Sequence, residues 1–440
     1  MTLPMPTLEE LEGVLRRHVL DAWFPRCIDH EEGGFLCDFD RRWSSSGPHD
    51  KLLEFQARQT LTAADAFRLY PEDQRLRDAA LHGFNYLRDA MWDGDAGGWF
   101  HRLDRAGRPL EAHTKHAHGA AYAIEACVAV HEATGSSQAL DLAREGFAWL
   151  EHCSRDPRHG GYYGFLQRDG TVIREASRCP WPAATDTIGT EIGLKDANVH
   201  SDLLETFVQL FHVWPDPKVG ERLEEVLEIV SAKMVVRESG ALQIFVTADW
   251  VPVPHLVRTG YQFQTAYRLT LARGVVGDAD TLRSLACHML EHGLRYARDP
   301  RGGYFYGVPG TYPLLLYGRD LRVRSKSWWV QAEALKALFA VSRLAPERIR
   351  YAEEFQQQWT YLSRDFLDER HGGFYASGLD TLGRRRLLGP GVAPRHVTAK
   401  GDAWKDASHD GRALMYCIES LRNGGKAPNG RSRPPRPEPG

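Results

Sequence analysis

The segment Asp29-His30-Glu31-Glu32-Gly33-Gly34-Phe35 combines acidic residues, a pair of glycines and an aromatic residue, and it recurs along the chain. The further copies are Asp95-Ala96-Gly97-Gly98-Trp99, Asp156-Pro157-Arg158-His159-Gly160-Gly161-Tyr162, Asp299-Pro300-Arg301-Gly302-Gly303-Tyr304 and Asp368-Glu369-Arg370-His371-Gly372-Gly373-Phe374. Successive copies lie 64, 63, 142 and 70 residues apart, and the wide gap holds a degenerate sixth copy, Glu238-Ser239-Gly240-Ala241-Leu242. Such self-similarity indicates a repeated unit, in which paired glycines form a tight loop after a helix.

Helices are predicted on both sides of each Gly-Gly loop from capping residues, alanine-rich stretches and terminating prolines. The predicted helices span 7–23, 51–69, 71–91, 115–133, 138–152, 197–213, 219–235, 261–273, 279–296, 325–343, 346–366 and 409–422. The order of helix, Gly-Gly loop and helix, repeated six times without alternating strands, predicts an all-α fold. We expect a closed (α/α)6 barrel of six helical hairpins, with short β-hairpins in loops such as 162–175 and 303–323.

Apolar content divides the predicted helices into two sets. Helices that follow a Gly-Gly loop, such as those containing 120–130 and 332–341, are the more apolar and are expected to form the inner ring. Helices that precede a loop are more charged and are expected outside. Residues 1–423 are predicted to form one barrel domain, and the proline- and glycine-rich tail 424–440 is predicted to be disordered.

The composition excludes several classes of protein. A net charge of −3 with acids and bases mixed gives no electrostatic basis for binding nucleic acid or a membrane surface. The seven cysteines are scattered without a Cys-x-x-Cys motif, and neither a secretion signal nor an apolar run of membrane-spanning length occurs. His-Glu-x-x-His, a glycine-rich phosphate loop and Gly-x-Ser-x-Gly are also absent. We therefore predict a soluble, cytoplasmic protein without a metal or cofactor.

Polar and aromatic residues gather at the starts of the predicted inner helices, which converge on one mouth in a closed helical barrel. Lys51 and Arg58 share a helix face and form a cation pair suited to an oxygen-rich ligand, with a solvated face as the alternative. At most one of His116 and His118 can face the mouth. The other candidate lining residues are Asn198, Asp202, Glu205, Tyr261, Gln264, Trp328, Trp329, Gln331, Glu333, Trp404, Lys405, His409 and Arg412. Aromatic platforms combined with hydrogen-bonding groups suit a neutral polyol, that is, a sugar.

With these residues in view, the chain resembles the N-acylglucosamine 2-epimerase and cellobiose 2-epimerase family, which includes aldose–ketose isomerases. The resemblance covers about residues 10–422 and rests on Glu32-Gly33-Gly34-Phe35, Gln56-Ala57-Arg58, Asn198 with Glu205, Trp328-Trp329-Val330-Gln331-Ala332-Glu333, and Trp404-Lys405 with His409 and Arg412. It implies an (α/α)6 barrel that acts on a small-molecule sugar by metal-free proton transfer.

The resemblance also implies a mechanism. One histidine, here His409, removes the proton from the carbon beside the opened aldehyde to give an enediolate, and a second histidine returns a proton. Arg58 would stabilise the enediolate oxygen. This chain departs from the cellobiose epimerases at Asp202, where they carry a histidine that some other family members lack. It departs from the family at Tyr261 and Gln264, where the family carries histidine and glutamate. Epimerisation by two bases would need Asp202 or Tyr261 as proton partner, and a tyrosine with its ordinary pKa of about 10 is a poor base.

Three hypotheses stay open at this point. The first is a sugar 2-epimerase or aldose–ketose isomerase. The second is a different reaction on a modified sugar or small biosynthetic metabolite. A change of reaction would explain why Tyr261 and Gln264 replace the family's histidine and glutamate. The third is a non-catalytic protein that binds a sugar or a partner. A glycoside hydrolase or lyase would need paired carboxylates, for which Asp186, Glu191 and Asp196 are available. A homodimer is compatible with the sequence.

Overall fold

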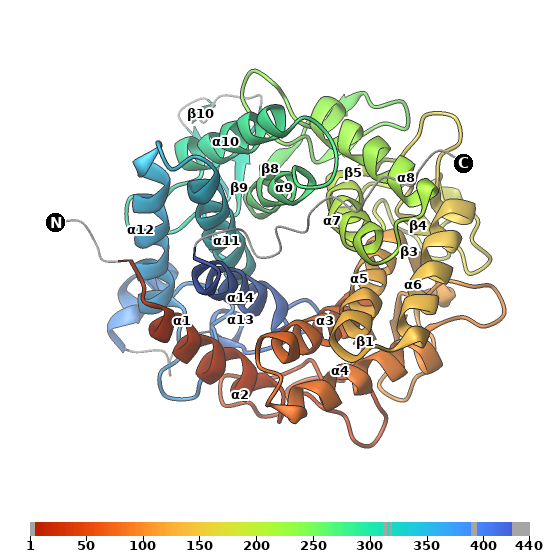
Figure 1. Cartoon of the computed structure of the whole chain (residues 1–440), viewed down its shortest axis with the longest axis horizontal. Helices are drawn as coiled ribbons and strands as arrows, with labels where there is room; N and C mark the ends of the chain where they lie inside the picture. The colour runs from red at the N-terminus through yellow and green to blue at the C-terminus, as the bar shows by residue number, and fades with distance from the viewer. Residues whose placement is uncertain (1–4, 311–314, 317–318, 389–393, 425–440) are drawn as a thin grey trace.

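The computed structural model describes residues 5–310, 315–316, 319–388 and 394–424. Within them, six inner helices form a closed ring in which each helix packs against the next and the last packs against the first (Figure 1). The inner helices are α3 (Leu53–Leu69), α5 (Ala117–Thr134), α7 (Ala197–Val213), α9 (Thr259–Ala272), α11 (Trp328–Leu344) and α14 (Ser408–Arg422).

An outer helix packs against each inner helix. Five of them follow their inner helix in the chain: α4 (Gln74–Tyr86), α6 (Ser137–Trp149), α8 (Pro217–Glu228), α10 (Ala279–Tyr296) and α12 (Ile349–Asp365). The sixth, α1 (Leu8–Leu15), packs on α14, so the first and last helices together close the ring. The predicted (α/α)6 barrel is thereby confirmed.

Shorter helical segments complete the described chain. Helix α1 continues through a π-helical turn at Arg16–Leu20 into α2 (Asp21–Trp23), and similar turns extend α4, α6 and α8 over Leu87–Met91, Leu150–Ser154 and Ile229–Met234. Short 3-10 segments lie at Glu111–His113, Ala176–Arg178 and Leu379–Leu388, and α13 spans Arg395–Thr398.

Short antiparallel strands connect neighbouring repeats or form a hairpin within one loop. The pairs are β1 (Lys51–Leu52) with β2 (Arg102–Leu103), β3 (Lys115–His116) with β4 (Phe165–Leu166), β8 (Leu256–Arg258) with β9 (Gly307–Pro309), and β10 (Leu315–Leu316) with β11 (Arg319–Asp320). A three-stranded sheet joins β5 (Lys195–Asp196), β6 (Phe245–Val246) and β7 (Pro252–Val253). The hairpin expected in 303–323 is present as β10–β11. Helices predicted from residues 51 and 115 begin two residues later, because those residues pair as strands.

Burial confirms the division into inner and outer helices. The first fourteen residues of α5, from Ala117 to Val130, are all buried, because this helix has neighbours on every side. In α8 burial is restricted to Val219, Leu223, Val226 and Leu227, whose spacing places them on one face. No helix among the described residues is long and apolar enough to cross a membrane. The predicted disordered tail lies outside the described residues, apart from Gly424.

All six Gly-Gly loops, including the degenerate one, share a backbone pattern. In the first loop the Asp29 N–H donates to the Gly34 carbonyl, and the Gly33 N–H donates back to the Asp29 carbonyl. Gly33 and Gly34 have φ values of 79° and 63°, in the left-handed region that favours glycine. Around Gly240 the Val236 N–H donates to the Ala241 carbonyl, and the Gly240 N–H to the Val236 carbonyl. The sixth copy predicted at 238–242 is confirmed.

A buried lysine–aspartate ion pair ties five of these loops to the chain just before the next inner helix. The pairs, with their Nζ–Oδ2 distances, are Lys51–Asp29 (2.8 Å), Lys115–Asp93 (3.1 Å), Lys195–Asp156 (2.8 Å), Lys326–Asp299 (2.9 Å) and Lys400–Asp368 (3.1 Å). The acid of the second loop is therefore Asp93, and the prediction of Asp95 was wrong. In the sixth loop, valines stand at both corresponding positions, Val236 and Val257. This loop therefore lacks both the carboxylate and the ammonium group.

We expect the two charges of one such pair to be strongly coupled. Replacing Lys195 or Asp156 alone by valine should lower the free energy of unfolding by about 3–5 kcal/mol, because the remaining charge stays buried without its partner. The double valine variant, which imitates the sixth loop, should lose less than the sum of the two single losses, by about 1–3 kcal/mol. Chemical denaturation of the four proteins measures the coupling, and additive losses would contradict it.

Candidate active site

His409, in the first turn of α14, lies at the centre of a cluster of charged and aromatic side chains. Its Nδ1 lies 2.8 Å from Glu333 Oε1, and Glu333 Oε2 lies 3.0 Å from Lys336 Nζ, both on α11. No hydrogen bond or ion pair among the described residues engages Nε2, and the residue is 8% exposed. Burial lowers the pKa of His409, and the Glu333 carboxylate offsets this only in part. The imidazole is therefore neutral near pH 7, with a ring nitrogen available to accept a proton.

The Trp329 ring packs against this imidazole, and two tyrosine rings pack against Trp329. The Trp329 ring centroid lies 5.8 Å from that of His409 and 5.1 Å from that of Tyr261, and the Tyr306 ring meets Trp329 edge-on at 6.0 Å. Burial, with the nearby negative charge of Asp202, raises the pKa of Tyr261 above its usual value. Tyr261 is therefore a neutral phenol that can donate a hydrogen bond, and it is a weaker acid than free tyrosine.

Arg58, on α3, is held at the same end of the ring by residues that precede α14. Its Nε lies 2.6 Å from Asp406 Oδ2, and its Nη2 donates to the Trp404 carbonyl at 3.0 Å. The guanidinium carbon lies 5.2 Å from the Tyr122 ring centroid and 6.0 Å from that of Trp404. These contacts fix the position of the cation while Trp404, 37% exposed, lies beside it.

His118, in the first turn of α5, is held by carboxylates from two other helices. Its Nδ1 lies 2.9 Å from Glu54 Oε1 on α3, and its Nε2 lies 3.0 Å from Asp202 Oδ2 on α7. Burial favours the neutral ring, but the two carboxylates outweigh it and raise the pKa of His118 to about 9. His118 is therefore an imidazolium near pH 7, the opposite protonation state to that of His409.

A chain of buried charges continues from Asp202 across the interior of the ring. Arg268 on α9 forms ion pairs with Asp202 and, at 2.9 Å through Nε, with Glu205. Arg412 on α14 lies 2.6 Å from Glu205 and 3.7 Å from Glu125. The arginines hold the pKa of Glu205 below its usual value, whereas burial and the charge of Glu205 raise that of Glu125 to about 8.

The structure distributes the remaining predicted residues among several environments. Lys51 does not form a cation pair with Arg58: its ammonium is buried against Asp29 in the first Gly-Gly loop, which corrects that prediction. Lys405 is buried 3.8 Å from Asp410 and 5.2 Å from the Trp328 ring, without a hydrogen bond at Nζ. Three other buried polar atoms among the candidates have neither a hydrogen-bond nor an ion-pair partner among the described residues: Asn198 Oδ1, Gln264 Oε1 and Trp328 Nε1.

The sequence analysis missed Glu54, Asp406 and Lys336, which hold the candidate residues in place. Glu54 lies four residues before Arg58 and Lys336 three residues after Glu333, so helical spacing alone could have indicated both. Asp406 caps the start of α14 by accepting hydrogen bonds from the N–H and hydroxyl of Ser408. An aspartate two residues before a serine at a helix start is a detectable capping signal, but its pairing with Arg58 is not.

One trio of potential metal ligands lies close together in the described residues: Cys37, Asp38 and His49. His49 Nδ1 accepts hydrogen bonds from the backbone N–H groups of Cys37 and Asp38, and its Nε2 lies 2.7 Å from the Ser45 hydroxyl. Burial also raises the pKa of the Cys37 thiol. Both ring nitrogens are already used and the thiol stays protonated, so the trio suits a structural turn better than a metal site.

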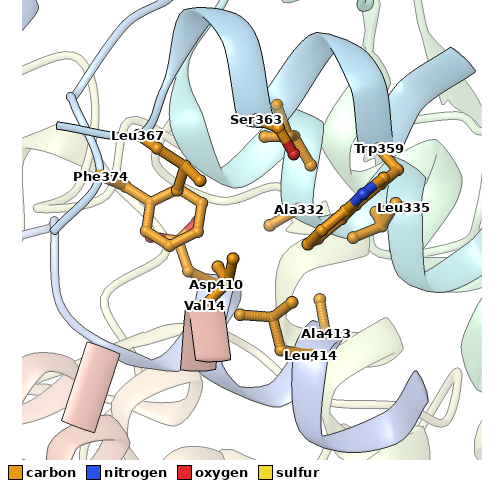
Figure 2. A pocket seen from close by; sticks show the side chains of 11 residues that line it. Val14, Ala332, Leu335, Trp359, Ser363, Leu367, Phe374, Asp410, Ala413 and Leu414 are labelled. Atoms are coloured by element: carbon orange, nitrogen blue, oxygen red, sulfur yellow. The ribbon is translucent and has the colours of Figure 1, made fainter. Parts of the chain in front are cut away.

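A small cavity lies where α1, α11, α12 and α14 meet (Figure 2). Its volume is about 10 Å³, room for roughly one water molecule, and its walls are apolar apart from Ser363 and Asp410. Burial raises the pKa of Asp410 to about 7, and its Oδ1 has no hydrogen-bond partner. The cavity is too small for a sugar.

Solved structures define the class of protein to which this arrangement belongs. A cellobiose 2-epimerase from Bacillus thermoamylovorans superposes with a TM-score of 0.80 at 20% identity, over 94% of this chain and 98% of that chain. A D-mannose isomerase superposes with a TM-score of 0.77 at 21% identity, over 95% and 100%. The chain is therefore an (α/α)6-barrel protein of the kind found in these sugar-converting enzymes.

Sequence comparison makes the relationship more specific. The family model described as N-acylglucosamine 2-epimerase (GlcNAc 2-epimerase) matches residues 182–384. A cellobiose 2-epimerase of Bacteroides fragilis is 25% identical over 94% of this chain and 98% of its own length. The chain is a distant homologue of the N-acylglucosamine 2-epimerase and cellobiose 2-epimerase family over nearly its whole length.

The pairing of Glu333 with His409 can be tested directly. Replacing Glu333 by glutamine should lower the pKa of His409 further, because the carboxylate is the group that raises it against the effect of burial. Histidine NMR titration of the two proteins measures this shift. The control is Glu354→Gln, which changes a buried carboxyl on α12 that pairs with Arg298 and should leave the His409 pKa unchanged. An increase in the Glu333→Gln variant would contradict the assignment.

Proposed function

We propose that this protein catalyses proton transfer at C2 of an open-chain sugar aldehyde, as a 2-epimerase or aldose–ketose isomerase. The observation that carries the proposal is the His409–Glu333 pair. A neutral imidazole with one nitrogen bound to a carboxylate and the other unengaged is the form that a general base requires. The family's mechanism, transferred by resemblance, assigns the same role to this position.

Arg58 is the group proposed to stabilise the enediolate. Its guanidinium is fixed by Asp406 and the Trp404 carbonyl, so it can face developing negative charge without reorganising. The aromatic rings of Trp329 and Trp404 offer stacking surfaces to the apolar face of a sugar. The unpartnered oxygens of Asn198 and Gln264 can accept hydrogen bonds from its hydroxyl groups.

The charges of this cluster favour an uncharged sugar. Arg58 is paired with Asp406 and Lys336 with Glu333. Arg268 is likewise paired with both Asp202 and Glu205. A phosphorylated sugar would need cations that these carboxylates do not already neutralise. The homologues include a cellobiose 2-epimerase and a D-mannose isomerase, which makes cellobiose, D-mannose and D-glucose the first substrates to test.

The test is hydrogen exchange at C2. Incubated in deuterium oxide with cellobiose, D-mannose or D-glucose, the wild-type protein should incorporate deuterium at C2 and form the epimer or the ketose, as NMR would show. His409→Asn should lower the rate by about 10²–10⁴-fold, because it removes the base. The control is His131→Asn, at the other end of α5, which should retain full activity. Full exchange by the His409 variant would overturn the assignment.

A further inference from the structure

Epimerisation and isomerisation of a sugar differ in where the proton returns. Once a base has removed the C2 proton of an open-chain aldose, epimerisation needs a second group that protonates C2 from the opposite face. Aldose–ketose isomerisation needs only the first base, which can return the proton to C1 on the face from which it came. The number of groups at the site that can carry a proton therefore decides between the two products.

His409 and Tyr261 contact the same indole ring. The Trp329 ring centroid lies 5.8 Å from that of His409 and 5.1 Å from that of Tyr261. A Cβ atom at Gly260 would overlap the Trp329 ring, so the indole rests directly on the backbone at the start of α9. This contact brings the start of α9, where the family resemblance places a second histidine, to the imidazole of α14.

The residue at that position in this chain is a phenol. Burial raises the pKa of Tyr261, and the negative charge of Asp202 raises it further. The hydroxyl therefore keeps its proton near pH 7 and is a weaker acid than that of free tyrosine. It can donate a hydrogen bond to a sugar oxygen, but it cannot take a proton from carbon.

Two further imidazoles, His116 and His118, stand at the start of α5 and have both ring nitrogens engaged. His118 lies between Glu54 and Asp202, at 2.9 and 3.0 Å. His116 Nδ1 accepts a hydrogen bond from the His118 N–H at 3.1 Å, and its Nε2 lies 3.1 Å from Asp186 Oδ2. Neither ring therefore offers a free nitrogen to a sugar.

The nearby carboxylates and the buried lysine are engaged as well. Arg268 pairs with both Asp202 and Glu205, and each of these carboxylates has a second cation beside it. Lys405 is fully buried beside Asp410, whose side chain lines the cavity that is too small for a sugar. These groups therefore offer no free basic atom to a substrate.

We propose that His409 is the only proton carrier between C2 and C1, so that the reaction is aldose–ketose isomerisation and not epimerisation. The proposal rests on the function proposed above. His409 Nε2 accepts the C2 proton, the C–H electron pair forms a C1–C2 double bond, and the carbonyl pair moves onto O1. Within this enediolate the hydroxyl proton passes from O2 to O1. The imidazolium then gives its proton to C1, where the double-bond pair forms the new C–H bond, and the O2 pair forms the ketone.

A single base reaches one face of C2, so two sugars that differ only at C2 should behave differently. Of D-glucose and D-mannose in deuterium oxide, one should exchange its C2 hydrogen and form the ketose, and the other should react at least 100-fold more slowly. Cellobiose and its C2 epimer should show the same preference. NMR of the wild-type reactions measures this. Similar exchange rates for both epimers, or formation of the C2 epimer ahead of the ketose, would overturn the proposal.

The same base should also act on the product. D-Fructose in deuterium oxide should gain one deuterium at C1, and His409→Asn should slow this exchange and the C2 exchange of the aldose by the same factor, at least 100-fold. Exchange of D-fructose that survives in this variant would reveal another proton carrier and overturn the proposal. The comparison variant is Tyr261→Phe, which removes the phenol hydroxyl. It should change neither the preferred epimer nor the product, and a change in either would equally overturn the proposal.

The outcome for the wild-type protein separates this proposal from the proposed function. If the wild-type converts an aldose into its C2 epimer as the first product, the proposed function stands and the single-base route fails. If it exchanges no C2 hydrogen in any of the four aldoses, both fail. The comparison of epimers uses the wild-type alone, so it does not depend on whether the variants fold, which circular dichroism would show.

Discussion

A buried lysine–aspartate pair fixes five of the six Gly-Gly loops to the chain just before the inner helix that follows. A buried ion pair is tolerated when further hydrogen bonds satisfy its remaining donors and acceptors. Lys195 illustrates this, because its ammonium also donates to the Gly160 and Ala248 carbonyls, at 2.7 and 2.9 Å. The valines of the sixth loop show the other physical solution, in which both charges are removed together. Both arrangements, the ion pair and the paired valines, lie just before the first turn of an inner helix. Residues of the candidate site, such as His118 and His409, stand in those first turns.

The repeated loop made the fold predictable, because few residues other than glycine adopt positive φ readily and paired glycines therefore leave a visible mark. The positions of charged side chains were less predictable. Lys51 stands at a helix start, where a ligand-binding cation would also stand, and its partner Asp29 lies 22 residues earlier. Arg58 lies beside Trp404, and the acid that holds it, Asp406, is 348 residues away. Helical spacing identifies which residues share a face, and it does not identify the partner across the ring.

The alternation of charges inside the ring explains which acids keep their protons. Along the chain of contacts the charged groups are Glu54, His118, Asp202, Arg268, Glu205 and Arg412. Asp202 and Glu205 each lie between two cations, and the two arginines hold the pKa of Glu205 below its usual value in spite of burial. Glu125, at the end, has a single arginine at 3.7 Å and the negative Glu205 nearby. Its pKa of about 8 follows from that imbalance.

The same reasoning explains why two histidines of one site differ in protonation. His409 has one carboxylate, and Glu333 divides its negative charge between this imidazole and Lys336, so the cost of burial prevails and the ring stays neutral. His118 has two carboxylates, Glu54 and Asp202, and their combined charge prevails over a comparable burial. The number of carboxylates around each ring, rather than its depth, therefore decides which imidazole is neutral and which is charged.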